Sequence, residues 1–296
     1  MPERFPLPTT DGERTIAAAE PQQVGDRRVT RTQVEFRDGS EGRVYVTDDG
    51  SVYPSVSTVV GSRDGDTTGL DRWKATHDGS TGAANWRDLL AFKSAVGTLV
   101  HHTVLDPYAD RDLWGTEERA ASSSLADLGS FAYPANGRLT ERDAITFGEE
   151  AVGWCRENAG EALSDLIDAV DVERFLIDET RGYAGQVDLV YETDLPGCSL
   201  AVCDLKTSKR VYHKHRLQAE AYAAALPASA DVLKVARIDP YRRATEESYS
   251  FQWVDPRSRW TDPVTRDDLR VEVETLAAEF RETRLPVRRV VPDARA

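Results

Sequence analysis

The strongest constraint on the fold is a run of three short apolar segments that end in charged residues. The segments are Val172–Ile177, Ala184–Tyr191 and Leu200–Leu205, with Gly182 and the Pro196-Gly197 turn between them. Their β-branched and aromatic content and these turn residues predict three strands. A helix at Tyr212–Leu226 and a strand at Val232–Ile238 follow. This order predicts an α/β (α+β) core with a mixed central sheet flanked by helices.

The rest of the chain is predicted to add a layer around this core. Alternation at Val29–Arg37 predicts a strand, and Asp48-Asp49-Gly50 marks a hairpin turn. Helices are expected at Val56–Val60 (capped by Ser55), Leu70–Thr76, Ala83–Leu105, Thr140–Ala169 and Thr265–Arg284, and a strand at Tyr249–Val254. Residues 1–28 are polar and are expected to be loosely ordered. We therefore expect an N-terminal unit of a hairpin and short helices at 1–80. A domain at 81–296 follows, with helix 83–105, a helical insert at 116–170, strands and a helix at 172–254, and a C-terminal helix at 265–284.

Charge at first argues against a nucleic-acid partner. The chain of 296 residues has 37 Lys+Arg against 51 Asp+Glu, a net charge of −14, and phosphates are repelled by acidic surfaces. However, Lys occurs at only six positions, and Ile is also scarce. Many Asp with few Lys and Ile are typical of a chain that works in molar salt, where the Debye length falls to about 3 Å. The acidity then reflects the solvent of a halophile or its virus rather than the partner.

Several classes of protein are disfavoured. No run of about 18 apolar residues predicts a membrane span, and the first residues lack the apolar stretch of a signal peptide, so we expect a cytoplasmic protein with no membrane partner. Cys155, Cys198 and Cys203 lack a C-x-x-C spacing, which argues against a disulfide framework, a zinc site or a four-cysteine iron–sulfur cluster. There is no G-x-x-x-x-G-K-[ST] loop, so the chain has no ATP motor of this type.

Charged residues at the strand ends are the first candidates for chemistry. Asp204 and Lys206 are two apart on one strand and therefore share a face, and Asp188 lies on the preceding strand. Two carboxylates beside one lysine suit a hard divalent cation and a phosphate. The alternatives are a salt-bridged strand end for Asp204 and Lys206, and a surface position near a turn for Asp188.

Two helices carry further candidates. Gln218 and Tyr222 are four residues apart and share a helix face, although ordinary helix packing also explains them. Gly97 precedes His101 on the long helix. A mid-helix glycine costs about 1 kcal/mol, which indicates that another part of the chain approaches closely there. A lone histidine on such a face is more often structural than a ligand.

Taken together, these segments resemble the PD-(D/E)xK nucleases, specifically their RecB-like exonuclease branch. That family has G-x-x-x-H, G-x-x-D, (D/E)-x-K and Q-x-x-x-Y in this order. The matching residues here are Gly97…His101, Gly185…Asp188, Asp204…Lys206 and Gln218…Tyr222. Upstream, the stretches 53–60 and 70–73 are similar to the entry segment of phage and mitochondrial single-strand exonucleases. The resemblance covers roughly residues 53–226 and implies a restriction-endonuclease-like core.

The resemblance also implies a set of roles. His101, Asp188 and Asp204 would bind Mg²⁺ or Mn²⁺ together with the Leu205 carbonyl, and Lys206 would act on the attacking water. Asp188, Asp204 and Lys206 would be the catalytic residues. Gln218 and Tyr222 would support the site or contact DNA. The cysteines that hold an iron–sulfur cluster in some relatives are absent, so no iron–sulfur cluster is expected. Glu173 is a further candidate carboxylate, with a surface position as the favoured alternative.

The segment from Lys206 to Arg216 is basic and has no acidic residue. It includes Lys209, Arg210 and Lys214, which we interpret as a rim that binds the phosphates of DNA; a solvated basic helix start is the alternative. Tyr212, Trp73 and Trp86 could stack on bases of a single strand, although a place in the core is the favoured alternative for each of them.

We therefore expect a metal-dependent DNA exonuclease, a hydrolase that prefers single strands or DNA ends and acts in repair, recombination or replication. A helicase or recombination protein is the expected kind of partner. Two alternatives stay open: a structure- or sequence-specific endonuclease of the same class, and a non-catalytic DNA-binding module with a relict site.

Overall fold

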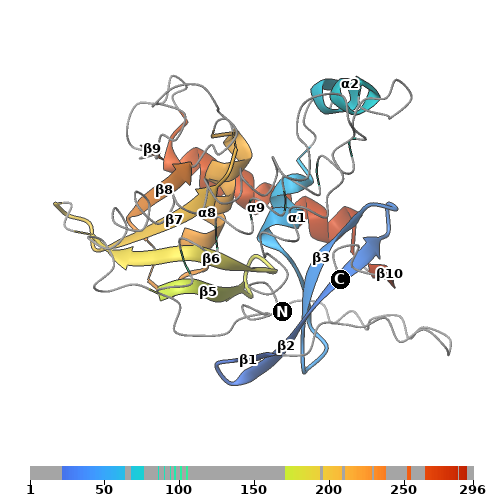
Figure 1. Cartoon of the computed structure of the whole chain (residues 1–296). Coiled ribbons are helices and arrows are strands. Elements are labelled where there is room, and N and C mark those ends of the chain that lie inside the picture. The colour runs from blue at the N-terminus through green and yellow to red at the C-terminus, as the bar shows by residue number, and fades with distance from the viewer. Residues whose placement is uncertain are drawn as a thin grey trace, which may run out of the picture.

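The structure is a computed structural model of the whole chain (Figure 1). It describes residues 22–63, 68–76, 86, 90, 94, 97, 101, 105, 171–193, 196–208, 211–228, 230–237, 252–254, 264–285 and 287–291. The predicted insert at 116–170 lies outside these residues. Of the predicted helix 83–105, the described residues are helical, and their spacing of three or four places them on one helix face.

The predicted mixed sheet is present, and we call it sheet B. It has five strands in the order β5-β6-β7-β8-β9, with bounds β5 Asp171–Asp178, β6 Tyr183–Glu192, β7 Leu200–Lys206, β8 Val232–Arg237 and β9 Gln252–Val254. The pair β7 and β8 is parallel, and the other pairs are antiparallel. Helix α8, His213–Ala225, makes the crossover that a parallel pair requires. The predictions of a mixed sheet and of an α+β chain are confirmed.

A second sheet, sheet A, is larger than the predicted hairpin. Strands β1 Gln22–Val24, β2 Arg27–Phe36, β3 Glu41–Thr47 and β4 Val52–Pro54 follow one another, and β10 Val287–Val291 pairs with the other side of β2. The turn between β3 and β4 is confirmed, with Gly50 at φ +80°. One expectation was wrong: residues 22–24 and 27–28 are strand rather than loose chain. The C-terminal strand β10 was not predicted.

Short helices follow sheet A, as expected. Helix α1, Val56–Gly61, begins after Ser55, whose Oγ accepts a hydrogen bond from the backbone N–H of Thr58 at 3.1 Å. Helix α2, Thr68–Thr76, comes next. The predicted division of the chain into residues 1–80 and 81–296 stays a prediction.

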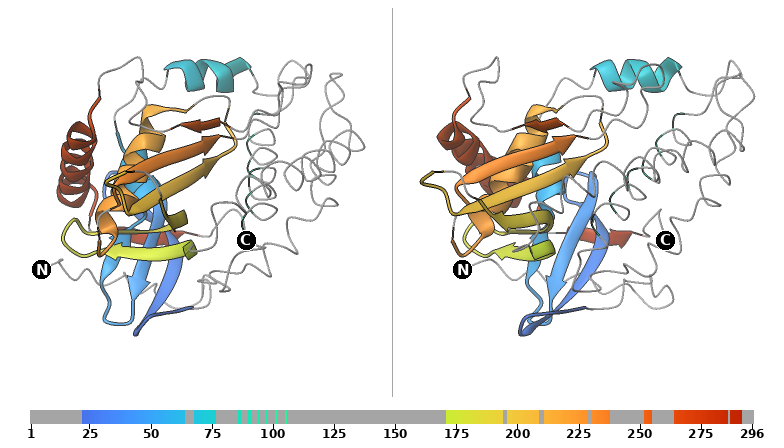
Figure 2. Two further views of the ribbon diagram at one scale, coloured as in Figure 1. Left: turned by 90° about the vertical axis from the view of Figure 1, so that its left-hand side faces the viewer. Right: turned by 60° about the vertical axis from the view of Figure 1, so that its left-hand side comes forward.

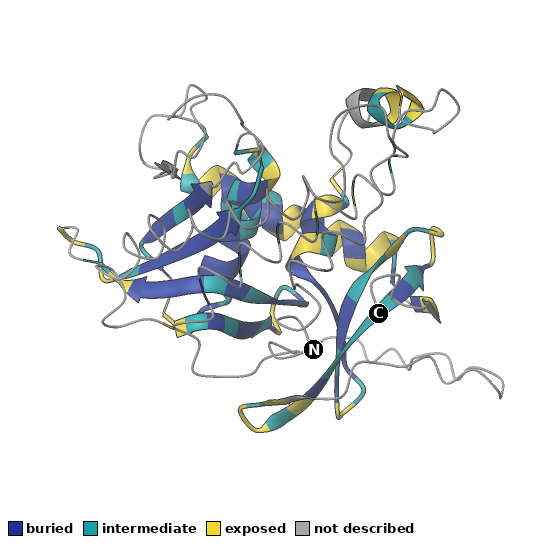
Figure 3. Cartoon of the chain, in the orientation of Figure 1, coloured by how far each residue is buried: buried dark blue, intermediate teal, exposed yellow. Residues whose placement is uncertain are grey.

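Helix α9, Arg266–Thr283, binds the two sheets into one core. A capping box starts it: Thr265 N–H donates to Asp268 Oδ2 at 2.8 Å, and Asp268 N–H donates to Thr265 Oγ1 at 3.2 Å. Its Phe280 packs edge-to-face on Phe36 of β2, with ring centroids 4.9 Å apart. The helix also contacts α1 and α8, and it lies along one side of the molecule (Figure 2). The buried residues form a continuous core across α1, α8, α9 and both sheets (Figure 3).

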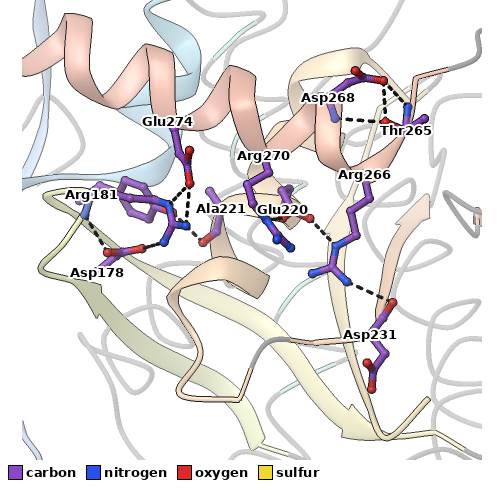
Figure 4. A network of polar contacts seen from close by, with 11 residues as sticks. Asp178, Arg181, Glu220, Ala221, Asp231, Thr265, Arg266, Asp268, Arg270 and Glu274 are labelled. Carbon is purple, nitrogen blue, oxygen red and sulfur yellow. Dashed lines mark hydrogen bonds and ion pairs between the residues drawn. The ribbon is translucent and has the colours of Figure 1, made fainter. Parts of the chain in front are cut away.

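A buried ionic network joins α8 to α9 (Figure 4). Glu220 of α8 is 0 % exposed. Its carboxylate accepts from Arg266 Nε at 2.7 Å and from Arg270 Nε at 3.0 Å, and Arg266 Nη1 also donates to the Asp231 carbonyl at 3.2 Å. A buried charge is tolerated only when it is paired in this way. The network therefore fixes α8 against α9.

None of the helices in the described part of the chain is both long and apolar enough to cross a membrane.

Candidate functional site

The two candidate aspartates lie side by side on neighbouring strands. Leu189 of β6 pairs with Cys203 of β7, so Asp188 and Asp204 are the next residues along each strand. The Asp188 carboxylate reaches across to β7, where Oδ2 accepts a hydrogen bond from the Leu205 backbone N–H at 2.6 Å. The alternative of a surface position near a turn is therefore wrong for Asp188.

Asp204 and Lys206 form a buried ion pair. Lys206 Nζ is 2.5 Å from Asp204 Oδ2, and the side chains are 19 % and 1 % exposed. Burial and the nearby Asp188 raise the pKa of Asp204 to about 6, although Lys206 opposes this. Burial alone would lower the pKa of Lys206. The charges of Asp204 and Asp188 outweigh burial, so the pKa is raised. The alternative of a salt-bridged strand end is therefore correct for Asp204 and Lys206. Asp188 also lies beside this pair, on the neighbouring strand.

His101 completes this group, which we call the carboxylate–lysine cluster: His101, Asp188, Asp204 and Lys206. Its Nε2 is 3.1 Å from the Leu205 carbonyl oxygen, and its Nδ1 is 3.6 Å from Asp188 Oδ1. Burial, followed by the charge of Lys206, lowers the pKa of His101 to about 4. The imidazole is therefore neutral at neutral pH. Because a carbonyl oxygen only accepts, Nε2 carries the proton, and Nδ1 turns a lone pair toward Asp188.

This pair of electron-rich atoms bears on metal binding. A nitrogen lone pair and a carboxylate oxygen that face each other suit a cation between them. Carboxylates, a carbonyl and one imidazole are the donors that Mg²⁺ and Mn²⁺ accept. The chemistry of the residues therefore fits a divalent ion. Within the described residues, however, no three His, Cys, Asp or Glu side chains are already spaced as metal ligands, so a bound ion would require side-chain adjustment.

Gly97 explains how the long helix comes so close to β7. A Cβ atom at this position would lie 3.1 Å from Oγ1 of Thr207, the residue after Lys206. The expectation of a close approach at Gly97 is confirmed. The contact lies one helical turn before His101. It therefore fixes how closely the His101 imidazole approaches the Leu205 backbone.

Helix α8 places Gln218 and Tyr222 beside the cluster. Gln218 Nε2 donates to the Tyr222 hydroxyl at 3.2 Å. Burial, and then the charges of Asp204 and Asp188, raise the pKa of Tyr222 well above its usual value, so the phenol lies toward both carboxylates. A Cβ atom on Gly185 would be 2.8 Å from Tyr222 Cε1, which explains the glycine of G-x-x-D. Tyr222 is also part of the core, so the helix-packing interpretation holds alongside the site.

Glu173 belongs to the site, and its expected surface position was wrong. The residue is 5 % exposed, and Gln186 Nε2 donates to its carboxylate at 2.6 Å. The pairs Val172–Leu189 and Arg174–Val187 place it opposite Asp188, and its charge acts on His101. Its backbone φ is +50°, and among the described residues it is the one residue other than glycine with a positive φ. The resemblance gives Glu173 as a further candidate carboxylate, but the sequence does not predict its burial, which depends on strand pairing.

The backbone of Glu173 should reveal strain on substitution. Glu173→Ala and Glu173→Gly both delete the carboxylate and leave Gln186 with the same lost partner. Since only glycine adopts a positive φ without steric cost, the glycine variant should be more stable by about 1 kcal/mol. Glycine normally destabilises a strand relative to alanine, so the order of the two variants is the test. Urea unfolding would measure it, and a more stable alanine variant would contradict the strain.

The basic segment after Lys206 is only partly described. Lys209 and Arg210 lie outside the described residues. Lys214 is exposed, at 6.0 Å from the Tyr212 ring centroid. The segment has no acidic residue of its own, but α9 supplies one: His213 Nε2 is 2.8 Å from Glu272, which also pairs with Arg63 at 2.8 Å. Of the three residues named for this rim beyond Lys206, Lys214 is thus the one that the structure describes.

The three candidate stacking residues differ in their surroundings. Tyr212 is exposed. Trp73 and Trp86 are half-buried, and Lys74 Nζ lies 5.0 Å above the Trp86 ring. Trp73 and Lys74 belong to α2, so Trp86 is in part covered by that helix. Tyr212 is thus the exposed residue of the three.

His215 gives the folded chain a defined pH dependence. The side chain is buried, and Nδ1 accepts from the Tyr212 backbone N–H at 3.2 Å. Burial, and then the charges of Lys206 and Lys214, lower the pKa of His215 to about 3. An unfolded histidine titrates near about 6.5. Above that pH the His215 ring is neutral in both the folded and the unfolded chain, and the stability that depends on the neutral ring is fully present. As pH falls from about 6.5 toward 3, the unfolded chain binds a proton that the folded chain does not, so stability is lost.

His215→Asn keeps a hydrogen-bond acceptor and removes this titration. Between pH 4 and 6.5, the free energy of unfolding of the wild type should fall more steeply with decreasing pH than that of the variant. The difference is up to about 1.4 kcal/mol per pH unit. Urea unfolding at constant KCl would measure both slopes, and parallel slopes would contradict the assignment.

Comparison with known proteins adds little to this picture. No family model matches the chain, and no curated protein matches it. Among solved structures, one titled "Crystal structure of SSO0001" is 17 % identical over 49 % of this chain and 67 % of its own, with a TM-score of 0.27. At that TM-score the likeness supports no conclusion about fold or function. The function must therefore be argued from the cluster itself.

Proposed function

We propose that the chain is a metal-dependent deoxyribonuclease with a PD-(D/E)xK core, and that it acts as an exonuclease on single-stranded DNA or DNA ends. The observation that carries the proposal is the carboxylate–lysine cluster. Four side chains from β6, β7 and the helix of Gly97 meet around the Leu205 backbone. A structural salt bridge needs only Asp204 and Lys206, whereas metal-assisted hydrolysis of a phosphodiester also needs the other two.

In this proposal each residue of the cluster has a role. His101, Asp188 and Asp204, with the Leu205 carbonyl, would hold one divalent cation. A bound Mg²⁺ or Mn²⁺ supplies positive charge that polarises the scissile phosphate and favours ionisation of a water molecule. An imidazole ligand favours Mn²⁺ over Mg²⁺. No iron–sulfur cluster is part of the proposal.

Lys206 would act through its charge. Asp204 and Asp188 raise its pKa, which favours the protonated ammonium group. It can donate hydrogen bonds that orient the attacking water, and it can balance the negative charge that develops on the phosphate. Tyr222 and Gln218 would support the two carboxylates from α8.

The test is a cleavage assay on the full chain with end-labelled linear single-stranded DNA. Cleavage is expected with Mn²⁺ or Mg²⁺ and not with EDTA, at both low and molar KCl. Circular single-stranded DNA should stay intact, because an exonuclease requires an end. Cleavage of the circle would assign the endonuclease alternative, and no cleavage of any DNA with either metal would reject the nuclease.

One observation favours the relict-site alternative: within the described residues, no group of three or more His, Cys, Asp or Glu side chains is already spaced as metal ligands. Calorimetry with Mn²⁺ separates the two possibilities. The proposed enzyme should bind Mn²⁺, and Asp188→Asn should weaken that binding. A chain that binds DNA but no Mn²⁺ would be a non-catalytic module. The nuclease proposal includes a role in DNA repair, recombination or replication, with a helicase as a partner. It also includes a cytoplasmic location.

A further inference from the structure

Tyr212 presents an aromatic ring at the surface of the protein. The large hydrophobic side chains exposed in the described part of the chain are Leu90, Tyr212 and Val271, and Tyr212, 38 % exposed, is the aromatic one. An exposed aromatic ring offers a flat face on which a base can stack. Tyr212 lies directly before α8, six residues after Lys206 in the sequence.

The ring of Tyr212 is held in place from within the protein. His215 packs on it edge-to-face, with centroids 5.3 Å apart and planes at 87°. The same imidazole accepts the Tyr212 backbone N–H at 3.2 Å. His215 is itself buried, so it forms a fixed support. A ring that is already ordered loses little conformational entropy when a ligand binds to it.

The surroundings of this ring pair are positively charged. After burial, the charges of Lys206 and Lys214 both lower the pKa of the His215 imidazole. Lys214 Nζ also lies 6.0 Å from the Tyr212 centroid. Lys214 therefore places a positive charge beside the ring pair. In a chain with a net charge of −14, such a place is complementary to an anionic ligand that also carries a flat ring.

We infer that Tyr212 is a stacking platform for one base of a single DNA strand, with neighbouring phosphates at Lys206 and Lys214. This inference rests on the proposed nuclease function. A base inside a duplex is covered on both faces by its neighbours, so the platform can accept a base only from a single strand or an open end. Tyr212 would thus select single-stranded DNA, whereas the cluster would cleave it.

The platform can be tested by binding without cleavage. Fluorescence anisotropy in EDTA would compare a labelled 12-nucleotide oligothymidylate with an abasic oligomer of the same length, which keeps the phosphates and lacks the bases. Tyr212→Ala is expected to weaken oligothymidylate binding by about 5- to 100-fold and to leave abasic binding unchanged. Tyr212→Phe should bind like the wild type. Val271→Ala, an exposed residue of α9, is the control and should also bind like the wild type.

Salt separates stacking from charge. At 1 M KCl, where the Debye length is about 3 Å, the effect of Tyr212→Ala should persist and that of Lys214→Ala should largely disappear. Equal binding of oligothymidylate by Tyr212→Ala and wild type would overturn the inference, as would an equal loss for both oligomers. In either case, cleavage by the wild type with Mn²⁺ would leave the proposed function standing. A wild type that neither binds nor cleaves DNA would reject both.

Discussion

Lys206→Ala is expected to abolish measurable cleavage of single-stranded DNA, with a fall of about 10²- to 10³-fold or more in rate. The ammonium group is the cationic side chain in contact with the buried carboxylate, 2.5 Å from Asp204. No other described side chain is placed to replace it, since His101 is neutral. The loss should appear in the rate of the chemical step, measured at DNA concentrations that saturate the variant.

Lys234→Ala is the matched control for this prediction. Lys234 lies on β8, paired with Cys203 of β7, and its ammonium group is 5.5 Å above the Tyr191 ring instead of in the cluster. Both variants remove one of the few lysines from adjacent strands of the same sheet. Lys234→Ala should keep wild-type activity, and equal activity of Lys206→Ala and wild type would reject the nuclease mechanism.

Folding of the Lys206 variant should not confuse the result. Asp204 loses its partner, but burial already raises its pKa to about 6. The carboxyl can therefore take up a proton instead of remaining as an unpaired buried charge. Circular dichroism and the urea midpoint at pH 6 should show a folded variant.

The site could be predicted from the sequence where local rules fix geometry. Asp204 and Lys206 share a face because a strand alternates, and Gln218 and Tyr222 share one because a helix turns every 3.6 residues. Gly97 predicts a close contact, because a glycine in the middle of a helix is otherwise unfavourable. The order of strands and α8 followed from apolar patterning and turn residues in the same way. These features depend on residues close together in the sequence.

The features that the sequence did not predict depend on pairing between distant segments. Glu173 is a buried carboxylate only because β5 pairs with β6 in the register that places it opposite Asp188. Strand β10 is short, and its partner β2 lies about 250 residues earlier. Glu220 has the pattern of a surface helix residue until α9 supplies two arginines. Composition and periodicity carry no information about such partners.

The network around Glu220 yields the largest expected change in stability. Arg266→Met with Arg270→Met should destabilise the fold by about 3–5 kcal/mol, because it leaves the Glu220 carboxylate buried without a partner. Glu220→Met should cost less. Both arginines are partly exposed, so they can turn to water once the carboxylate is gone.

Two further variants make this a test of charge burial rather than of helix packing. Glu220→Met combined with both arginine substitutions should recover most of the loss, because well-packed apolar residues often replace a buried ionic group at no net cost. Glu274→Ala removes the partly exposed partner of Arg181, 2.8 Å away at the surface of α9 (Figure 4), and should change stability by less than about 1 kcal/mol. Urea unfolding at constant KCl would measure all four variants. If the double arginine variant loses no more stability than Glu274→Ala, the contacts of Glu220 do not hold α8 against α9. In that case apolar contacts such as Leu217 and Leu269 must fix the helix that carries Gln218 and Tyr222.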